Sequence, residues 1–220
     1  MMFRAHRRKL ATDNSGAAAI EFAFISIALL LLTFAVLDIG FALYWFNRAE
    51  KATQLGVRVA AVSNPVTNYL DLFSGTPNSV PAVASPGQAG EGCESPTGTL
   101  ESFCDHPDVT CTATNGTGSC SLGTFSNAAF SKIFNEMRTL YPQLESNNVQ
   151  VEYRPSLIGF AGRPGNAPGT YNLVPQVTVR IVGLEYNYIA LGSLLGLAPF
   201  TLPDISASMT GEDLDHTTPL

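Results

Sequence analysis

The sequence predicts an α+β fold in which one long N-terminal helix precedes a shorter helix and a small antiparallel sheet. The first observation is an apolar run over 17–37, which is long enough for a membrane-spanning helix. The second is the helical spacing of apolar residues over 126–141, between a serine and a proline. The third is an alternation of apolar and polar residues, typical of strands, over 149–153, 176–186 and 205–209.

The apolar run predicts a single membrane-spanning helix, which we place at 17–41. In lipid the backbone must satisfy its own hydrogen bonds, and a single span does so only as a helix. Positive charge before the run predicts a cytoplasmic N-terminus, which would put the domain that follows outside the cytoplasm. The basic residues of this leader, 1–16, are Arg4, Arg7, Arg8 and Lys9. This arrangement is typical of a single-pass membrane protein.

A secretory signal is a weaker interpretation of the same run. Its apolar part would span only ~7–15 residues and would end in a small-residue cleavage site. The run here is longer, and its small residues Ala17, Ala18 and Ala19 lie at the near end. An anchor that stays uncleaved and a segment that is processed at its start both remain open.

One carboxylate lies inside the apolar run, close to a glycine. Glu21 is the only charged residue from Ala17 to Leu37, and Gly16 directly precedes the run. A charge at this depth is costly unless it has a partner or a function. It could also be an unpaired carboxylate whose side chain reaches the cytoplasmic interface. Asp38, at the other end of the run, needs no special role on the sequence alone.

Gly16 and the following Ala-Ala-Ala-Ile-Glu-Phe, residues 17–22, resemble the class III signal of type IV pilins and pseudopilins. The stretches 37–44 and 56–61 are similar to the TadE-like family, the minor pseudopilins of the tight-adherence (Flp pilus) machinery. The resemblance is strongest over 15–62, and Asp38 departs from the glutamate expected in many members.

The resemblance implies a pilin-like domain and a role in assembling Flp pili, which serve adhesion, biofilm formation and secretion. It also implies a single-pass protein of the bacterial inner membrane, with its C-terminal domain in the periplasm or outside the cell. It implies that a prepilin peptidase cuts between Gly16 and Ala17. Glu21 and Phe22 would then be recognised by a neighbouring subunit or by the peptidase. The expected partners are the membrane, that peptidase, other pilins or pseudopilins and the pilus assembly platform. The alternative function is an uncleaved, single-pass membrane anchor that displays an extracytoplasmic binding domain.

The helix is predicted to continue beyond the membrane over 42–63 and to stop before Pro65. Small residues follow a helical spacing along this part, and small residues let another helix or sheet approach closely. That surface could pack on the protein's own sheet, on a neighbour, or on both. Its members are Ala42, Ala49, Ala52, Leu55, Gly56, Val59 and Ala60.

Four cysteines fall in the Gly-, Pro- and Ser-rich stretch 64–125, which we expect to be an irregular loop. In an exported region, an even cluster predicts two disulfides, with three pairings open. Zinc is the weaker interpretation because no C-x-x-C pair occurs. The cysteines are Cys93, Cys104, Cys111 and Cys120.

The C-terminal part, 126–220, completes the predicted domain. Within it, 189–200 is apolar but too short to span a membrane. We expect it to be a buried connection, although its surface could also touch a neighbour or the outer leaflet. No phosphate-binding, metalloprotease or serine-hydrolase motif occurs, so we expect no enzyme, cofactor, metal or small-molecule substrate. The 8 basic and 15 acidic residues after Asn47 argue against nucleic-acid binding.

Overall fold

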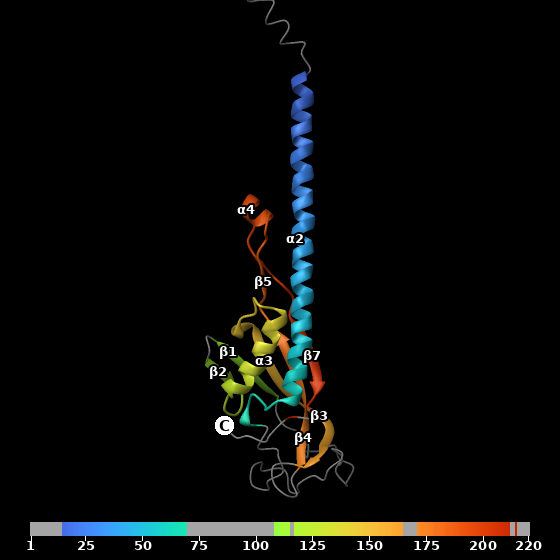
Figure 1. Cartoon of the computed structure of the whole chain (residues 1–220). Coiled ribbons are helices and arrows are strands. Elements are labelled where there is room, and N and C mark those ends of the chain that lie inside the picture. The colour runs from blue at the N-terminus through green and yellow to red at the C-terminus, as the bar shows by residue number, and fades with distance from the viewer. Residues whose placement is uncertain (1–14, 70–107, 115–116, 165–170, 212–213, 215–220) are drawn as a thin grey trace, which may run out of the picture. The chain divides into compact units, whose positions relative to one another are not determined.

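The α+β class is confirmed by a computed structural model of the chain (Figure 1). The structure describes residues 15–69, 108–114, 117–164, 171–211 and 214. It divides into two compact units, and helix α2 contributes to both. The first contains 1–44 and 185–200, and the second contains 45–184 and 201–220.

Helix α2 runs from Ser15 to Val62 without a break, as the sequence predicted. Two hydroxyl groups in its apolar part donate to carbonyl groups of the same helix. Ser26 donates to the carbonyl of Phe22, and Thr33 donates to that of Leu30, each at 2.8 Å. Each hydroxyl group therefore has a hydrogen-bond partner within the helix itself, which suits a helix in lipid. Pro65, which has no N–H group, follows the helix end.

The second unit is built on a five-stranded antiparallel sheet in the order β2-β1-β3-β4-β7. Its strands are β1 (Val109–Thr114), β2 (Thr117–Cys120), β3 (Val149–Pro164), β4 (Tyr171–Ile181) and β7 (Ile205–Thr210). Alternation along β3 buries Val149, Val151 and Tyr153 on one face. That face carries the hydrophobic core.

Helix α3 (Asn127–Leu140) and the C-terminal turns of α2 cover the apolar face of the sheet (Figure 1). Ser126 is the N-cap of this helix, because its hydroxyl accepts a hydrogen bond from the backbone N–H of Ala129 at 3.4 Å. Phe130, Ile133 and Met137 are buried on one face of α3, as their spacing predicted.

The small residues of α2 allow α3 to lie close to it. Ala49, Ala52 and Ala60 are fully buried in the core of the second unit. A Cβ atom on Gly56 would lie only 2.6 Å from the sulfur of Met137. Along this stretch, therefore, the small-residue surface packs within its own domain, one of the two possibilities that the sequence left open.

The chain leaves α2 along a fixed route. The backbone N–H of Val66 donates to the hydroxyl oxygen of Tyr153 at 2.9 Å, and the N–H of Ser126 donates to the carbonyl of Val66 at 2.7 Å. Tyr153 is fully buried, and this burial raises the pKa of its hydroxyl. The phenol therefore stays neutral and keeps this bond throughout the physiological pH range.

The prediction of an irregular loop up to residue 125 is wrong for 109–114 and 117–120. These residues form the hairpin of β1 and β2, and a disulfide joins Cys111 to Cys120 across it. The inward residues of β1 are Val109, Cys111 and Ala113, which follow the strand alternation despite the polar composition. Cys93 and Cys104 lie outside the described residues, so the second disulfide stays a prediction.

The predicted strand 176–186 also ends early. Strand β4 stops at Ile181, and Gly183 adopts a positive φ of 62°, which favours glycine. The chain then forms β5 (Glu185–Tyr186), which pairs with β6 (Phe200–Thr201) in a separate two-stranded sheet. In contrast, β3 continues to Pro164, well beyond the strand predicted over 149–153.

Replacing Gly56 by alanine should destabilise the second unit. The added methyl group would press on the buried Met137 side chain, and overpacking costs ~1–3 kcal/mol. This loss exceeds the ~0.5–1 kcal/mol normally gained when alanine replaces glycine in a helix. Gly40→Ala is the matched control, because nothing lies within 4 Å of its Cβ position.

Denaturant unfolding of the full chain in detergent, followed by Trp45 fluorescence, measures this effect. Trp45 is the only tryptophan and contacts Tyr141 edge-on, with ring centroids 5.9 Å apart, so it reports on this packing. An unchanged midpoint for Gly56→Ala would show that Met137 moves aside freely.

Candidate functional site

The segment 16–37 of α2, which we call the apolar segment, exposes large apolar side chains on all sides. Phe22, Phe24 and Ile25 are 74%, 70% and 67% exposed. Within the described residues, α2 is the one helix long and apolar enough to cross a membrane. Such a surface needs non-aqueous surroundings. The apolar segment thus suggests a single-pass membrane anchor.

The predicted processing and recognition residues lie in the first turns of α2. Gly16, Ala17, Glu21 and Phe22 are all helical and exposed. Ala17 and Glu21 are four residues apart, which puts them on the same face of the helix. Within the part of the chain that is described, Glu21 forms no ion pair. Their predicted roles in processing and recognition are not decided by this placement.

Among the described residues of the first unit, Asp38 makes extensive polar contacts, although the sequence analysis gave it no special role. One carboxylate oxygen accepts hydrogen bonds from the backbone N–H groups of Ile189 and Ala190, at 2.9 and 3.2 Å. The other accepts from the N–H of Leu191 at 2.9 Å. The Tyr186 hydroxyl donates to the backbone carbonyl of Asp38 at 2.9 Å. We call this set of contacts the Asp38 clasp.

The clasp has a clear physical reason. The three N–H groups precede and begin α4 (Leu191–Leu195), where backbone donors lack intrahelical acceptors. Asp38 is only 2% exposed, and a buried carboxylate is tolerated when several donors surround it. Burial and the charge of Asp38 both raise the pKa of Tyr186, which keeps its hydroxyl protonated as a donor. A carboxylate at the end of an apolar run was the only signal of the clasp in the sequence.

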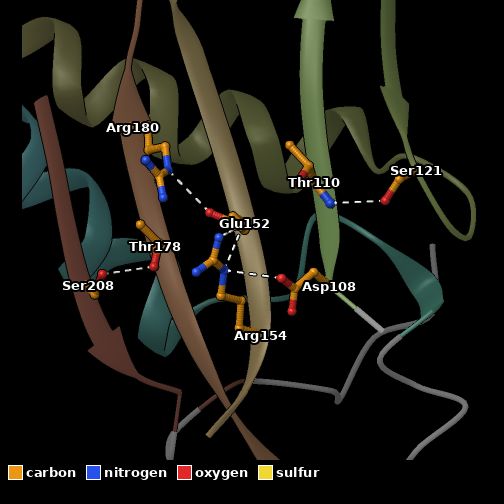
Figure 2. Close-up of polar contacts among 8 residues, drawn as sticks. All are labelled: Asp108, Thr110, Ser121, Glu152, Arg154, Thr178, Arg180 and Ser208. Atoms are coloured by element: carbon orange, nitrogen blue, oxygen red, sulfur yellow. Dashed lines mark hydrogen bonds and ion pairs between the residues drawn. The ribbon is translucent and has the colours of Figure 1, made fainter. Parts of the chain in front are cut away.

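The sheet of the second unit carries a polar network on the face away from α3 (Figure 2). Glu152 accepts from Arg154, whose Nη2 lies 2.6 Å from one carboxylate oxygen, and from Arg180, whose Nε lies 3.2 Å from the other. The hydrogen bond that Arg154 donates to the Glu152 carboxylate is the main cause that raises the pKa of Arg154. Asp108 completes the network at 3.3 Å from the Nε of Arg154.

This network joins strands rather than forming an open site. Register places Thr110, Glu152, Thr178 and Ser208 in one row across β1, β3, β4 and β7. The hydroxyls of Thr178 and Ser208 are 2.8 Å apart. Two carboxylates and two guanidinium groups balance in charge, so the network stabilises cross-strand pairing.

No cluster of three or more His, Cys, Asp or Glu that could hold a metal occurs among the residues described. Cys111 is committed to its disulfide and is therefore not a zinc ligand. His6, His106 and His216 all lie outside the described residues. The expectation that the chain is not an enzyme stays a prediction.

Replacing Asp38 by asparagine should loosen the Asp38 clasp. The variant keeps the size but removes the charge and turns an amide NH₂ toward backbone donors. Losing charged hydrogen bonds to buried groups costs ~1–3 kcal/mol. Hydrogen exchange at residues 189–191 should therefore accelerate by about tenfold or more. Asp204→Asn, at an exposed position, is the control and should leave these amides unchanged. Unaltered exchange in Asp38→Asn would show that the clasp does not stabilise the segment.

Comparison with known protein families finds a match in the N-terminal part of the chain. Residues 16–58 match the model of a family described as TadE-like protein. No curated protein and no solved structure matches the chain. The matched residues cover the apolar segment, Asp38 and the small residues up to Gly56. The resemblance of this part of the chain to the TadE-like family is confirmed, and it suggests a function related to the Tad pilus.

Proposed function

We propose that the chain is a minor pseudopilin that a prepilin peptidase processes and that acts in assembling Flp, or tight-adherence, pili. In this proposal it lies in the bacterial inner membrane, with its N-terminus in the cytoplasm and its C-terminal domain in the periplasm or outside the cell. The observation that carries the proposal is Glu21, an exposed carboxylate five residues beyond Gly16 in an otherwise uncharged, exposed apolar segment. The family match over 16–58 supports it.

Cleavage between Gly16 and Ala17 is compatible with the start of α2. The helix begins at Ser15, so the bond to be cut lies in its first turn. Backbone N–H groups there have no intrahelical acceptor, and helix ends open at little cost in free energy. A peptidase could therefore draw this turn into an extended conformation without disturbing the rest of the helix.

Cleavage would create a new amine on Ala17 and give Glu21 a partner. Each charge alone in or near lipid is costly, and pairing offsets part of this desolvation. Both charges lie on one helix face, so a subunit displaced along the helix axis can present its carboxylate to a neighbour's amine. Pairing between subunits would fix their axial register in an assembly. The partners in this scheme are other pilins or pseudopilins and the assembly platform.

The first experiment tests processing. The mature protein should begin at Ala17 and retain its apolar segment, as intact-mass analysis of membrane-extracted protein would show. Gly16→Val should leave the longer precursor in the membrane, because a peptidase that grips an extended backbone has little room for a branched side chain. Gly40→Val, further along the same helix, is the control and should be cleaved normally. A mature chain that starts at Met1 would favour the uncleaved anchor that displays a binding domain.

The second experiment separates processing from assembly. Glu21→Gln removes the charge and keeps the size, so an Ala17 amine on a neighbouring subunit would lose its counter-charge. Cleavage should be largely kept while piliation and surface adhesion fall in a complementation assay. Glu50→Gln removes the same charge outside the apolar segment and serves as control. Wild-type assembly by Glu21→Gln would reject the pairing between subunits.

A further inference from the structure

A second apolar surface of the first unit lies far from the apolar segment in the sequence. Residues 187–200, which we call the tip, connect β5 to β6, and no charged residue occurs from Tyr186 to Pro203. The expectation of a buried connection is wrong, because the tip exposes large side chains. The exposed fractions are 56% for Ile189, 58% for Leu194, 54% for Leu195, 43% for Leu197 and 38% for Phe200.

The Asp38 clasp fixes the tip beside the end of the apolar segment. Three N–H groups of the tip bind the Asp38 carboxylate, one residue beyond Leu37, where the uncharged run ends. Figure 1 shows α4 beyond β5 in the direction of the N-terminal end of α2. The exposed leucines of the tip therefore lie beside the last turns of the apolar segment and share its surroundings.

Several backbone N–H groups of the tip have hydrogen-bond acceptors within the chain. Besides the three donors bound by Asp38, the N–H of Leu194 bonds to the carbonyl of Ala190 at 3.3 Å. The N–H of Gly196 donates to the carbonyl of Gly192 at 2.9 Å. Gly196 has a φ of 67°, and this left-handed conformation ends α4. Backbone groups that face lipid must be satisfied within the protein, and these bonds do so for five N–H groups of the tip.

Aromatic rings form the base of the tip. Tyr186, Tyr188 and Phe200 have ring centroids 5.5 to 6.0 Å apart. Tyrosine favours the membrane interface, where its ring is in an apolar region and its hydroxyl reaches polar groups. Glu185 and Asp204, both exposed, are the first charges on either side. The pattern is an uncharged apolar end, an aromatic base and flanking charges.

We propose that the tip inserts into the outer leaflet of the membrane beside the membrane-spanning part of α2. The chain would then hold the bilayer by two elements, the helix that spans it and a loop that enters from one side. This inference rests on the membrane anchoring included in the proposed function. Lipid is the occupant that the structure favours, because the clasp joins the tip to the segment that lipid itself surrounds.

Tryptophan quenching in vesicles tests the insertion. The full chain with Trp45→Phe is reconstituted into phosphatidylethanolamine–phosphatidylglycerol vesicles that contain phosphatidylcholine brominated on its acyl chains. Leu195→Trp then reports on the tip. Leu32→Trp reports on the apolar segment, and Met209→Trp, exposed on β7, reports on the domain surface. Leu194→Trp repeats the tip measurement should Leu195→Trp disturb folding, which circular dichroism would show.

We expect Leu195→Trp to have a blue-shifted emission and to be quenched by brominated lipid, as Leu32→Trp is, whereas Met209→Trp is not quenched. Quenching of Leu32→Trp but not of either tip variant would overturn the inference and leave the anchoring intact. A tip that lipid does not quench but that is shielded from aqueous acrylamide would instead indicate a protein contact. An unquenched Leu32→Trp would overturn both the anchoring and the inference.

Discussion

Helix α2 is one unbroken helix whose two parts have different surroundings. The packing of the other elements depends on which side chains it presents in each part. Up to Leu37 it carries large apolar side chains that are exposed. Between Ala49 and Ala60 the side chains that meet the core are small. Large residues offer lipid a broad apolar surface, whereas small ones allow α3 to approach until Met137 lies against Gly56. Continuity of the helix keeps its backbone groups bonded throughout.

Two carboxylates, Glu21 inside the apolar segment and Asp38 directly after it, differ in their surroundings. Asp38 has three backbone donors from the same chain, so its charge is already compensated. Glu21 has no ion-pair partner in the described part of the protein. For this reason Glu21, and not Asp38, is the residue for which we propose a partner in another molecule. Asp38 instead has an architectural role, because it fixes the segment around α4.

The sheet of the second unit shows the same principle that polar groups in poorly hydrated places need partners within the chain. Glu152 is nearly buried on the polar face and is held by Arg154 and Arg180. Because these partners come from β3 and β4, the network supports the register of those strands. The disulfide between Cys111 and Cys120 does the same for the β1–β2 hairpin, whose polar composition gives little apolar stabilisation.

Local sequence patterns determined the long helix, its end before Pro65, the capped helix α3 and the strands β3, β4 and β7. In each case the periodicity of apolar residues, or a capping residue next to them, lies within the element itself. The sequence also marked Gly16 and Glu21 as a pair of interest, although the structure leaves their roles untested.

Only the tertiary structure decided what depends on residues far apart. The β1–β2 hairpin is rich in polar residues and gains its stability from the pairing of β1 with β3 and from a disulfide, so its own pattern is weak. The backbone donors that bind the Asp38 carboxylate lie more than 150 residues further along the chain, and no local spacing could reveal them. The exposure of the tip follows from the same contact. Periodicity reports which side of an element is apolar, whereas the identity of what covers that side depends on the complete fold.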